Sequence, residues 1–217
     1  MRAALLELLV PSVCPACDVP RGSGVPLLCS RCRHRLRPLH ELGGVATVLA
    51  YEGCGAELIR RFKYAGRRDA LAVLLPALSA RAADLSREHR LDALVPVPRH
   101  VSRVRELGAD PVHDLGRAVA RRLGLPLLGR ALRRTRASSP QTSLAPLERA
   151  RNVAGSFRTG RSLVAGRRVL LLDDVTTTGA TLQAARRELL ERGEARAVVP
   201  LAAAGTQVLP DLLPAAL

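Results

Sequence analysis

Residues 169–181 combine a short apolar run, two adjacent carboxylates and a hydroxyl-rich turn around a glycine. The four apolar residues 169–172 follow two arginines, which predicts a strand covered on both faces in a parallel sheet. Beyond Thr181 apolar residues recur at helical spacing, so the segment predicts a strand, a tight turn and a helix. The backbone N–H groups of residues 176–181 then lie at a helix N-terminus, which favours bound anions. The segment is therefore a candidate phosphate-binding loop in an α/β fold.

Two other interpretations of this segment exist. A strand-to-helix turn occurs in most α/β proteins, where Asp and Thr are ordinary turn and cap residues. Paired carboxylates at a strand end also hold metal in proteins with a GxxxxGK[ST] loop, but the only lysine, Lys63, follows Arg-Phe and no such loop. No glycine cluster completes GxGxxG either. The two commonest nucleotide-binding loops are therefore absent from the sequence.

The composition is that of a globular protein with a basic surface. Its 217 residues suffice for one substantial core and a small appendage, and 47% hydrophobic but only 2% aromatic residues predict a core of Leu, Val and Ala. The formal net charge of +15 favours polyanionic partners, nucleic acid first, whereas a solvated basic surface is the alternative. Because few aromatic side chains are available to stack on bases, backbone binding is favoured over sequence readout.

Four of the five cysteines form two CxxC pairs, Cys14 with Cys17 and Cys29 with Cys32. Two such pairs at short separation predict a four-thiolate zinc site, which is structural because no coordination position stays open. Two disulfides or a redox motif are the alternatives. The N-terminal apolar stretch is interrupted by Glu7 and followed by Pro11, which argues against an export signal and favours a reducing, cytoplasmic location. No apolar segment approaches the length of a membrane span.

Strand and helix patterns alternate along the rest of the chain. The expected strands cover residues 45–52, 91–97, 127–133, 169–172 and 197–201, the expected helices cover 55–66, 69–89, 114–123 and 181–192, and residues 138–152 are expected to be a polar loop or short helix. This alternation predicts a parallel sheet with right-handed crossovers. Ligands gather at the carboxyl ends of such strands, where Pro98, Asp173 and Asp174 would lie.

The string of residues 169–181 resembles the binding motif of type I phosphoribosyltransferases, which recognise 5-phosphoribosyl 1-pyrophosphate (PRPP). The resemblance implies that Asp173 and Asp174 are the catalytic pair and contact the ribose hydroxyls. It further implies that the turn binds PRPP, chiefly its 5-phosphate, through Val175, Thr176, Thr177, Thr178, Gly179, Ala180 and Thr181. An active transferase of this type would also use magnesium, bound with PRPP.

Further segments extend the resemblance over nearly the whole chain. The paired CxxC motifs, residues 62–66 (FKYAG), residues 95–98 (VPVP), Gln141, Glu148, Arg149, Asn152 and Val153 together resemble the ComF family, whose members are linked to bacterial competence. The resemblance implies a zinc-binding double-CxxC module at residues 1–40 and a phosphoribosyltransferase-like domain at 41–217. It implies that the loop from Pro98 to Arg103 meets pyrophosphate, through Pro98, Arg99 and Arg103, and that residues 138–152 form a flexible loop that closes over the site.

The resemblance also sets the expected function. It implies a PRPP-binding protein of ComF type, a phosphoribosyltransferase or a factor derived from one, that acts in DNA uptake or processing. The alternative is a non-catalytic accessory protein that binds single-stranded DNA or another nucleic acid, or other competence proteins. One stretch departs from the family pattern: where many members carry Arg-Gly-Phe-Asn-Gln, residues 106–111 are Glu-Leu-Gly-Ala-Asp-Pro, so that Gly108 alone matches.

Overall fold

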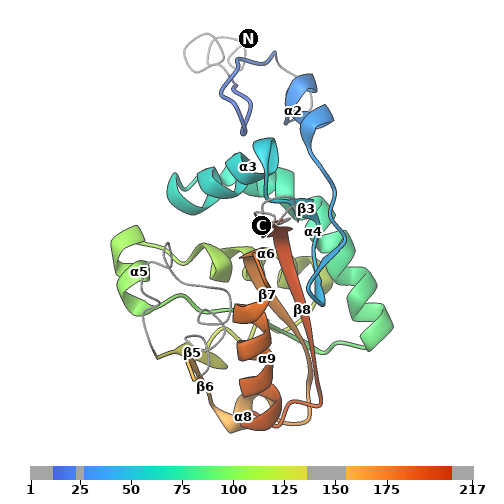
Figure 1. Ribbon diagram of the computed structural model, residues 1–217, viewed down its shortest axis with the longest axis vertical. Coiled ribbons are helices and arrows are strands. Elements are labelled where there is room, and N and C mark those ends of the chain that lie inside the picture. Colours follow the sequence, from blue (N-terminus) through green and yellow to red (C-terminus); the bar gives the residue numbers. More distant parts are fainter. Residues whose placement is uncertain (1–11, 23–26, 136–154, 207–217) are drawn as a thin grey trace, which may run out of the picture.

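A six-stranded, mostly parallel sheet forms the centre of the structure (Figure 1). The computed structural model describes residues 12–22, 27–135 and 155–206. The strands follow in the order β1 (Glu41–Leu42), β2 (Val45–Ala46), β8 (Ala197–Gly205), β7 (Arg168–Thr176) and β4 (Ala93–Pro96), and β3 (Leu49–Ala50) also pairs with β8. β8 runs parallel to β2, β3 and β7, and β7 runs parallel to β4, whereas β1 and β2 are antiparallel. The expected parallel α/β sheet is confirmed.

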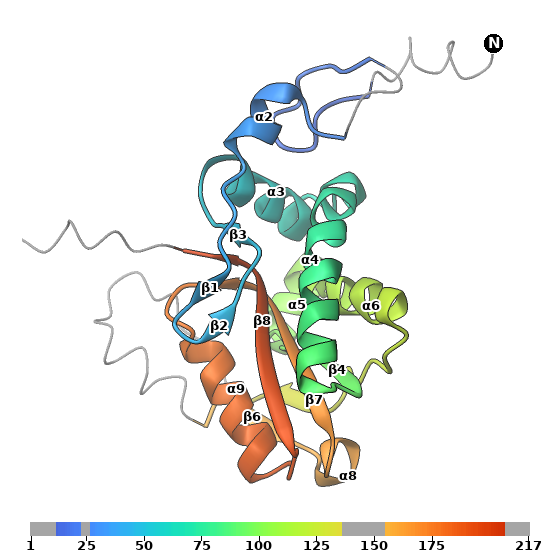
Figure 2. The ribbon, with the colours of Figure 1, turned by 90° about the vertical axis from the view of Figure 1, so that its right-hand side faces the viewer.

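Helices cover both faces of this sheet (Figures 1 and 2). One face carries α3 (Gly53–Tyr64), α4 (Arg68–His89) and α6 (Pro111–Leu123), and the other carries α9 (Ala180–Glu191). The shorter elements are α2 (Ser30–Arg35), α5 (Val101–Leu107), α8 (Arg161–Val164) and a separate antiparallel pair, β5 (Leu132–Arg134) with β6 (Phe157–Thr159). Among the described helices none is both long enough and apolar enough to cross a bilayer.

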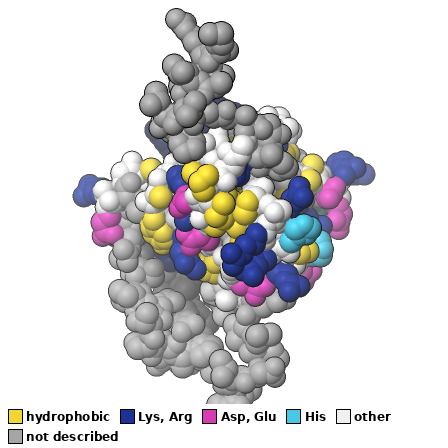
Figure 3. All heavy atoms as spheres, turned by 90° about the horizontal axis from the view of Figure 1, so that it is seen from above, with side chains coloured by type: hydrophobic (Ala, Val, Ile, Leu, Met, Phe, Trp, Pro, Cys, Tyr) yellow, Lys and Arg dark blue, Asp and Glu magenta, His cyan; other side chains and the backbone are white. Residues whose placement is uncertain are grey.

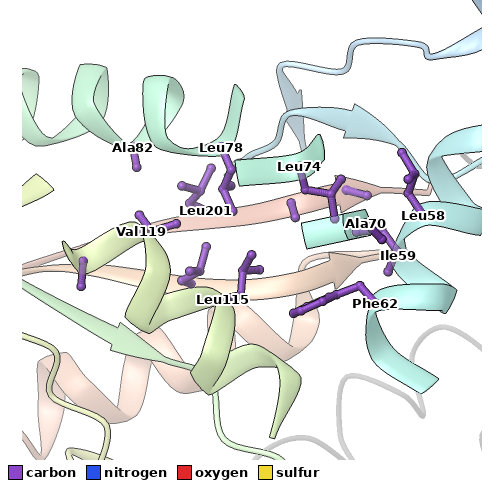
Figure 4. Close-up of a cluster of buried hydrophobic side chains, with 14 of the residues drawn as sticks. Leu58, Ile59, Phe62, Ala70, Leu74, Leu78, Ala82, Leu115, Val119 and Leu201 are labelled. Atoms are coloured by element: carbon purple, nitrogen blue, oxygen red, sulfur yellow. The ribbon is translucent and has the colours of Figure 1, made fainter. Parts of the chain in front are cut away.

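β7 separates two layers of the core, because successive side chains of a strand point to opposite faces. Leu170 and Leu172 pack in the layer formed with α3, α4 and α6, and Val169 and Leu171 pack in the layer formed with α9. Figure 4 shows side chains of α3, α4 and α6 meeting over the strands in the first layer. All four β7 side chains are fully buried, which confirms the expected strand with two covered faces. This packing fixes the position of β7, whose carboxyl end carries the two acids.

The long helices agree with the sequence patterns. The four expected helices correspond to α3, α4, α6 and α9, with ends that differ by a few residues. α6 begins three residues earlier than expected because the Asp110 carboxylate accepts a hydrogen bond from the His113 N–H (3.2 Å) and Pro111 occupies the first turn. Apolar periodicity located the helices, whereas capping decided this boundary.

Several strand predictions need correction. The expected strand at 45–52 is split into β2 and β3, and at the break the Thr47 hydroxyl donates to the Leu39 carbonyl (2.6 Å). The expected strand at 127–133 begins only at Leu132 and lies outside the main sheet, since Leu127 forms a single bridge with Leu94 before the chain turns. β7 runs on through both acids to Thr176. Residues 138–152 lie outside the described part of the chain.

Candidate functional site

β7 and α9 are joined by a hydroxyl-rich turn at the carboxyl edge of the sheet. The Thr176 hydroxyl is buried and accepts a hydrogen bond from the Gly179 N–H (3.1 Å), so it shapes the turn from inside. Thr177 and Thr178 are exposed. Gly179 has a φ of 77°, and α9 begins at the next residue. The turn thus presents two exposed hydroxyls beside the N-terminus of a 12-residue helix.

The tip of the β1 and β2 hairpin supports this turn. A Cβ atom on Gly179 would lie 3.2 Å from the Gly43 carbonyl oxygen, and one on Gly43 would lie 3.3 Å from the Thr178 carbonyl oxygen. Both glycines also have positive φ values, 58° for Gly43 and 77° for Gly179. Two loops that are far apart in the sequence can therefore approach closely because neither carries a side chain at the contact.

A pocket of about 320 Å³ opens next to this turn. Its walls come from the end of α3, the segment after β4, the strand β5, the end of β7 and the start of α9. They consist of Lys63, Tyr64, Val97, Pro98, Arg99, Arg134, Asp173, Asp174 and Thr181. Three cationic side chains and two carboxylates thus converge at one edge of the sheet. A pocket of this composition suits a ligand with both anionic groups and hydroxyls.

Asp174 is the nearly buried carboxylate of this pocket, with 6% of its side chain exposed. Lys63 Nζ lies 2.8 Å and Arg99 Nη2 lies 2.9 Å from the same atom, Asp174 Oδ2. Lys63 comes from α3, which covers the face of the sheet on which Leu170 and Leu172 also lie. Two positive charges therefore hold one oxygen of Asp174.

Asp173 lies in the same pocket in a different environment. Desolvation and then the neighbouring Asp174 carboxylate raise the pKa of Asp173, whereas the Asp174 N–H, Lys63 and Arg134 lower it, with a net value of about 7. The Asp174 N–H donates to Asp173 Oδ1 at 2.8 Å. Asp174 Oδ1 and Asp173 Oδ2 have no hydrogen-bond partner among the residues that the structure describes. These two oxygens remain available to a ligand.

The structure brings five of the predicted PRPP-contacting residues into the pocket: Pro98, Arg99, Asp173, Asp174 and Thr181. The other predicted residues, from Val175 to Ala180, lie at the end of β7, in the turn and at the start of α9. The expected loop at 98–103 is shorter than predicted, because α5 begins at Val101 with His100 as its cap. Arg103 therefore lies in α5, and the structure does not describe its side chain.

The sequence prediction of the site missed Lys63, Tyr64 and Arg134. Lys63 could have been singled out from the sequence, because it is the only lysine among 34 basic residues. Arg134 could not have been singled out in this way, since arginines are abundant in this chain. Burial lowers the pKa of Arg134, the Asp173 carboxylate opposes this, and the guanidinium lies 5.4 Å from the centre of the Phe157 ring.

The four cysteines of the CxxC pairs form a second candidate site. Their sulfur atoms all lie within 4.8 Å of one another, and Cys17 Sγ and Cys29 Sγ are 3.7 Å apart. A tetrahedral zinc with Zn–S bonds of about 2.3 Å would separate its sulfurs by roughly 3.8 Å. The Cys32 N–H points to Cys29 Sγ (3.4 Å), and backbone N–H groups, opposed by burial, lower the pKa of Cys14 to about 6. The cluster can therefore hold a metal ion.

The cysteine cluster is linked to the pocket through α3. Cys14 and Cys32 are buried in the same core layer as Leu58 and Phe62 of α3. Asp18, next to Cys17, forms ion pairs with Arg61 at 2.5 Å and with Arg67 at 3.0 Å. The same helix carries Lys63 to Asp174. One helix thus contacts both candidate sites.

The chain is similar in sequence to known proteins over most of its length. The family described as "Phosphoribosyl transferase domain" matches residues 114–212. The chain is 28% identical over 196 residues to the competence protein ComFC of Bacillus subtilis, covering 89% of this chain and 78% of the relative. It is 30% identical over 187 residues to the DNA utilization protein YhgH of Escherichia coli (strain K12), covering 85% and 80%. Among solved structures, the glutamine PRPP amidotransferase of B. subtilis aligns with 66% of this chain and 30% of its own, at a TM-score of 0.41 and 22% identity.

Proposed function

The chain belongs to the ComF family, and from that premise we propose that it binds PRPP in the pocket at the carboxyl end of β7. The observation that carries this proposal is the convergence of Asp173, Asp174, Arg99 and Lys63 beside the threonine turn. PRPP has vicinal hydroxyls, a 5-phosphate and a pyrophosphate. Each of these groups has a chemically matched partner in or beside the pocket.

The free carboxylate oxygens of Asp173 and Asp174 accept hydrogen bonds from the ribose hydroxyls. Thr177, Thr178 and the backbone N–H groups at the start of α9 bind the 5-phosphate. Arg99 and Arg134 line the same pocket and stabilise the negative charge of the pyrophosphate. Carboxylates and phosphates are the oxygen ligands that magnesium prefers, and the ion would neutralise charge on the pyrophosphate.

Calorimetric titration with PRPP and magnesium tests this proposal. We expect about one PRPP to bind per chain. In Asp174→Asn the affinity should fall at least tenfold, because a neutral amide oxygen accepts hydrogen bonds from the ribose hydroxyls more weakly than a carboxylate oxygen does. Asp84→Asn, which changes an exposed carboxylate paired with Arg87 on α4, is the matched control and should bind as wild type. A wild-type protein that gives no heat of binding at millimolar PRPP contradicts the proposal.

We further propose that bound PRPP is a substrate and that the ribosyl group is transferred to an acceptor with release of pyrophosphate. The matching family is a phosphoribosyl transferase domain. Incubation with radiolabelled PRPP and a panel of acceptors, followed by assay of released pyrophosphate, tests the transfer. PRPP binding without acceptor-dependent release would remove the transferase proposal and leave the binding proposal intact.

A second candidate function, binding of single-stranded DNA, is favoured by the β5 and β6 pair. Arg133 lies directly opposite Arg158 across these antiparallel strands, an arrangement that is unfavourable without an anion. Arg130 joins them around a surface pocket of about 410 Å³. The names of these relatives refer to competence and DNA utilization. On the face seen in Figure 3, by contrast, basic side chains alternate with acidic and hydrophobic ones.

Fluorescence anisotropy with labelled single-stranded DNA tests this second function. We expect affinity to fall steeply with salt and to weaken in Arg133→Ala combined with Arg158→Ala, because fewer phosphates are then neutralised. Arg87→Ala, on the remote surface of α4, is the control. Equal binding by the double variant and the control would exclude this surface.

We also propose that the cysteine cluster holds structural zinc and that the module containing it ends near residue 40, before β1. The four thiols and their separations suit zinc, which has no open position when four thiolates bind it. Free thiols persist in a reducing compartment, which accords with a cytoplasmic protein. About one zinc per chain in metal analysis is the expected result.

A further inference from the structure

A larger cavity lies beside the proposed PRPP pocket. It has a volume of about 560 Å³, is formed by α3, α4, the segment before α6 and α6 itself, and shares Lys63 and Tyr64 with the smaller pocket. Small-molecule sites commonly have volumes of about 300 to 1,000 Å³. The two cavities are therefore neighbours that could hold two ligands side by side.

The walls of the larger cavity carry an excess of positive charge. Arg68 of α4 and Arg121 of α6 are exposed and form no ion pair or hydrogen bond with other described residues. Arg117 adds a third guanidinium, which lies 3.5 Å from the single wall carboxylate, Asp114. Guanidinium groups bind carboxylates through paired N–H donors. Because Lys63 and Arg117 are each paired with a carboxylate, Arg68 and Arg121 are the described wall cations that remain to bind an anionic group such as a carboxylate.

The cavity also has an aromatic side chain at its border and small side chains in its wall. Tyr64, at the border between the two pockets, is 64% exposed and offers its ring for stacking. Phe62 belongs to the core layer shown in Figure 4. Ala109 and Pro111, which belong to the stretch that departs from the ComF pattern, line the cavity with small side chains. A phenylalanine at position 109 would occupy space that Ala109 leaves open.

We propose that this cavity binds the acceptor of the phosphoribosyl group, a planar aromatic molecule with a carboxylate and a nucleophilic nitrogen. This inference rests on the proposed function. Arg68 and Arg121 bind the carboxylate, and Tyr64 stacks on the ring. In the transfer, the nitrogen lone pair forms the bond to C1 of the ribose and the C1–O bond to pyrophosphate breaks. Pyrophosphate leaves with that electron pair. An N–H nitrogen, as in anthranilate or orotate, then loses its proton to water, whereas a pyridine nitrogen, as in nicotinate, becomes a pyridinium.

Titration of the full chain with anthranilate, nicotinate and orotate, each with and without PRPP and magnesium, tests the proposal. We expect saturable binding of at least one acid, and about tenfold weaker binding by Arg68→Ala and by Arg121→Ala. Arg122→Ala is the matched control, because Arg122 is an exposed neighbour outside the cavity wall, and it should bind as wild type. Ala109→Phe should block the acids and retain PRPP binding.

Several results would overturn the inference. They are an absence of binding for all three acids, equal binding by Arg121→Ala and Arg122→Ala, or AMP or aniline binding as tightly as the acids. Thermal melts of the variants check folding, and the exposed Arg121 gives a test that does not depend on the cavity-filling variant. If PRPP binds and the acids do not, only this inference fails. If PRPP itself does not bind, the proposed function fails as well.

Discussion

At the scale of single residues, Lys63 at the end of α3 neutralises the buried carboxylate of Asp174. Its Nζ lies 2.8 Å from Asp174 Oδ2, and both side chains are largely buried. Lys63→Met should lower the free energy of unfolding by roughly 1–3 kcal/mol, because Asp174 then keeps a buried charge with only Arg99 beside it. Urea unfolding measures the change. Lys63→Arg, which keeps the charge, should lose less, and equal stability of wild type and Lys63→Met would contradict the role.

Asp173 should make stability depend on pH. Its pKa in the folded chain, about 7, lies above the ordinary value of 3.8, so the folded state keeps a proton that the unfolded state releases between these values. The free energy of unfolding should therefore fall as pH rises from about 4 to about 7 and then level off. Asp173→Asn does not titrate, so its stability should not fall over this range. The melting temperature of Asp173→Asn minus that of wild type should therefore be larger at pH 8 than at pH 4.5. An unchanged difference between the two pH values would refute the assignment.

At the scale of elements, the contact between the β1 and β2 hairpin and the turn before α9 depends on glycine. Gly179→Ala should destabilise the fold and weaken PRPP binding, because the new Cβ meets the Gly43 carbonyl oxygen at 3.2 Å in a backbone with φ of 77°. Gly166→Ala is the matched control, with a similar φ of 71° and no atom within 4 Å of the new Cβ. It should cost about 1 kcal/mol and leave PRPP binding unchanged. Equal effects of the two changes would show that the hairpin contact contributes nothing.

The elements also show how far local sequence predicts this structure. Apolar periodicity predicted α3, α4, α6 and α9, because each buries one face along several turns. It missed α5, a short helix whose start depends on the His100 side chain, and it ended β7 too early because carboxylates are rare inside strands. The turn between β7 and α9 was predicted from a local string of residues. Lys63 and Arg134 were not, since only the tertiary fold brings the end of α3 and the end of β5 to the same pocket as the end of β7.

At the scale of the whole molecule, α3 should couple the cysteine module to the proposed PRPP pocket. Its Arg61 pairs with Asp18 of the module, and its Lys63 pairs with Asp174. Cys17→Ser combined with Cys32→Ser should release the metal and weaken PRPP binding, because the module no longer holds α3 in position. Asp18→Asn should keep the metal and weaken PRPP binding less. Metal analysis beside calorimetry measures both, and a metal-free double variant with wild-type PRPP affinity would show that the two sites are independent.

The central claim is that PRPP binds where β7 meets α9. Hydrogen–deuterium exchange with and without PRPP and magnesium tests it most directly, because it locates the ligand along the chain. We predict slower exchange for peptides covering residues 173–182 and 97–103, and no change for α4 or for residues 160–167. Slower exchange confined to other segments, or unchanged exchange at 173–182 under saturating PRPP, would contradict the account.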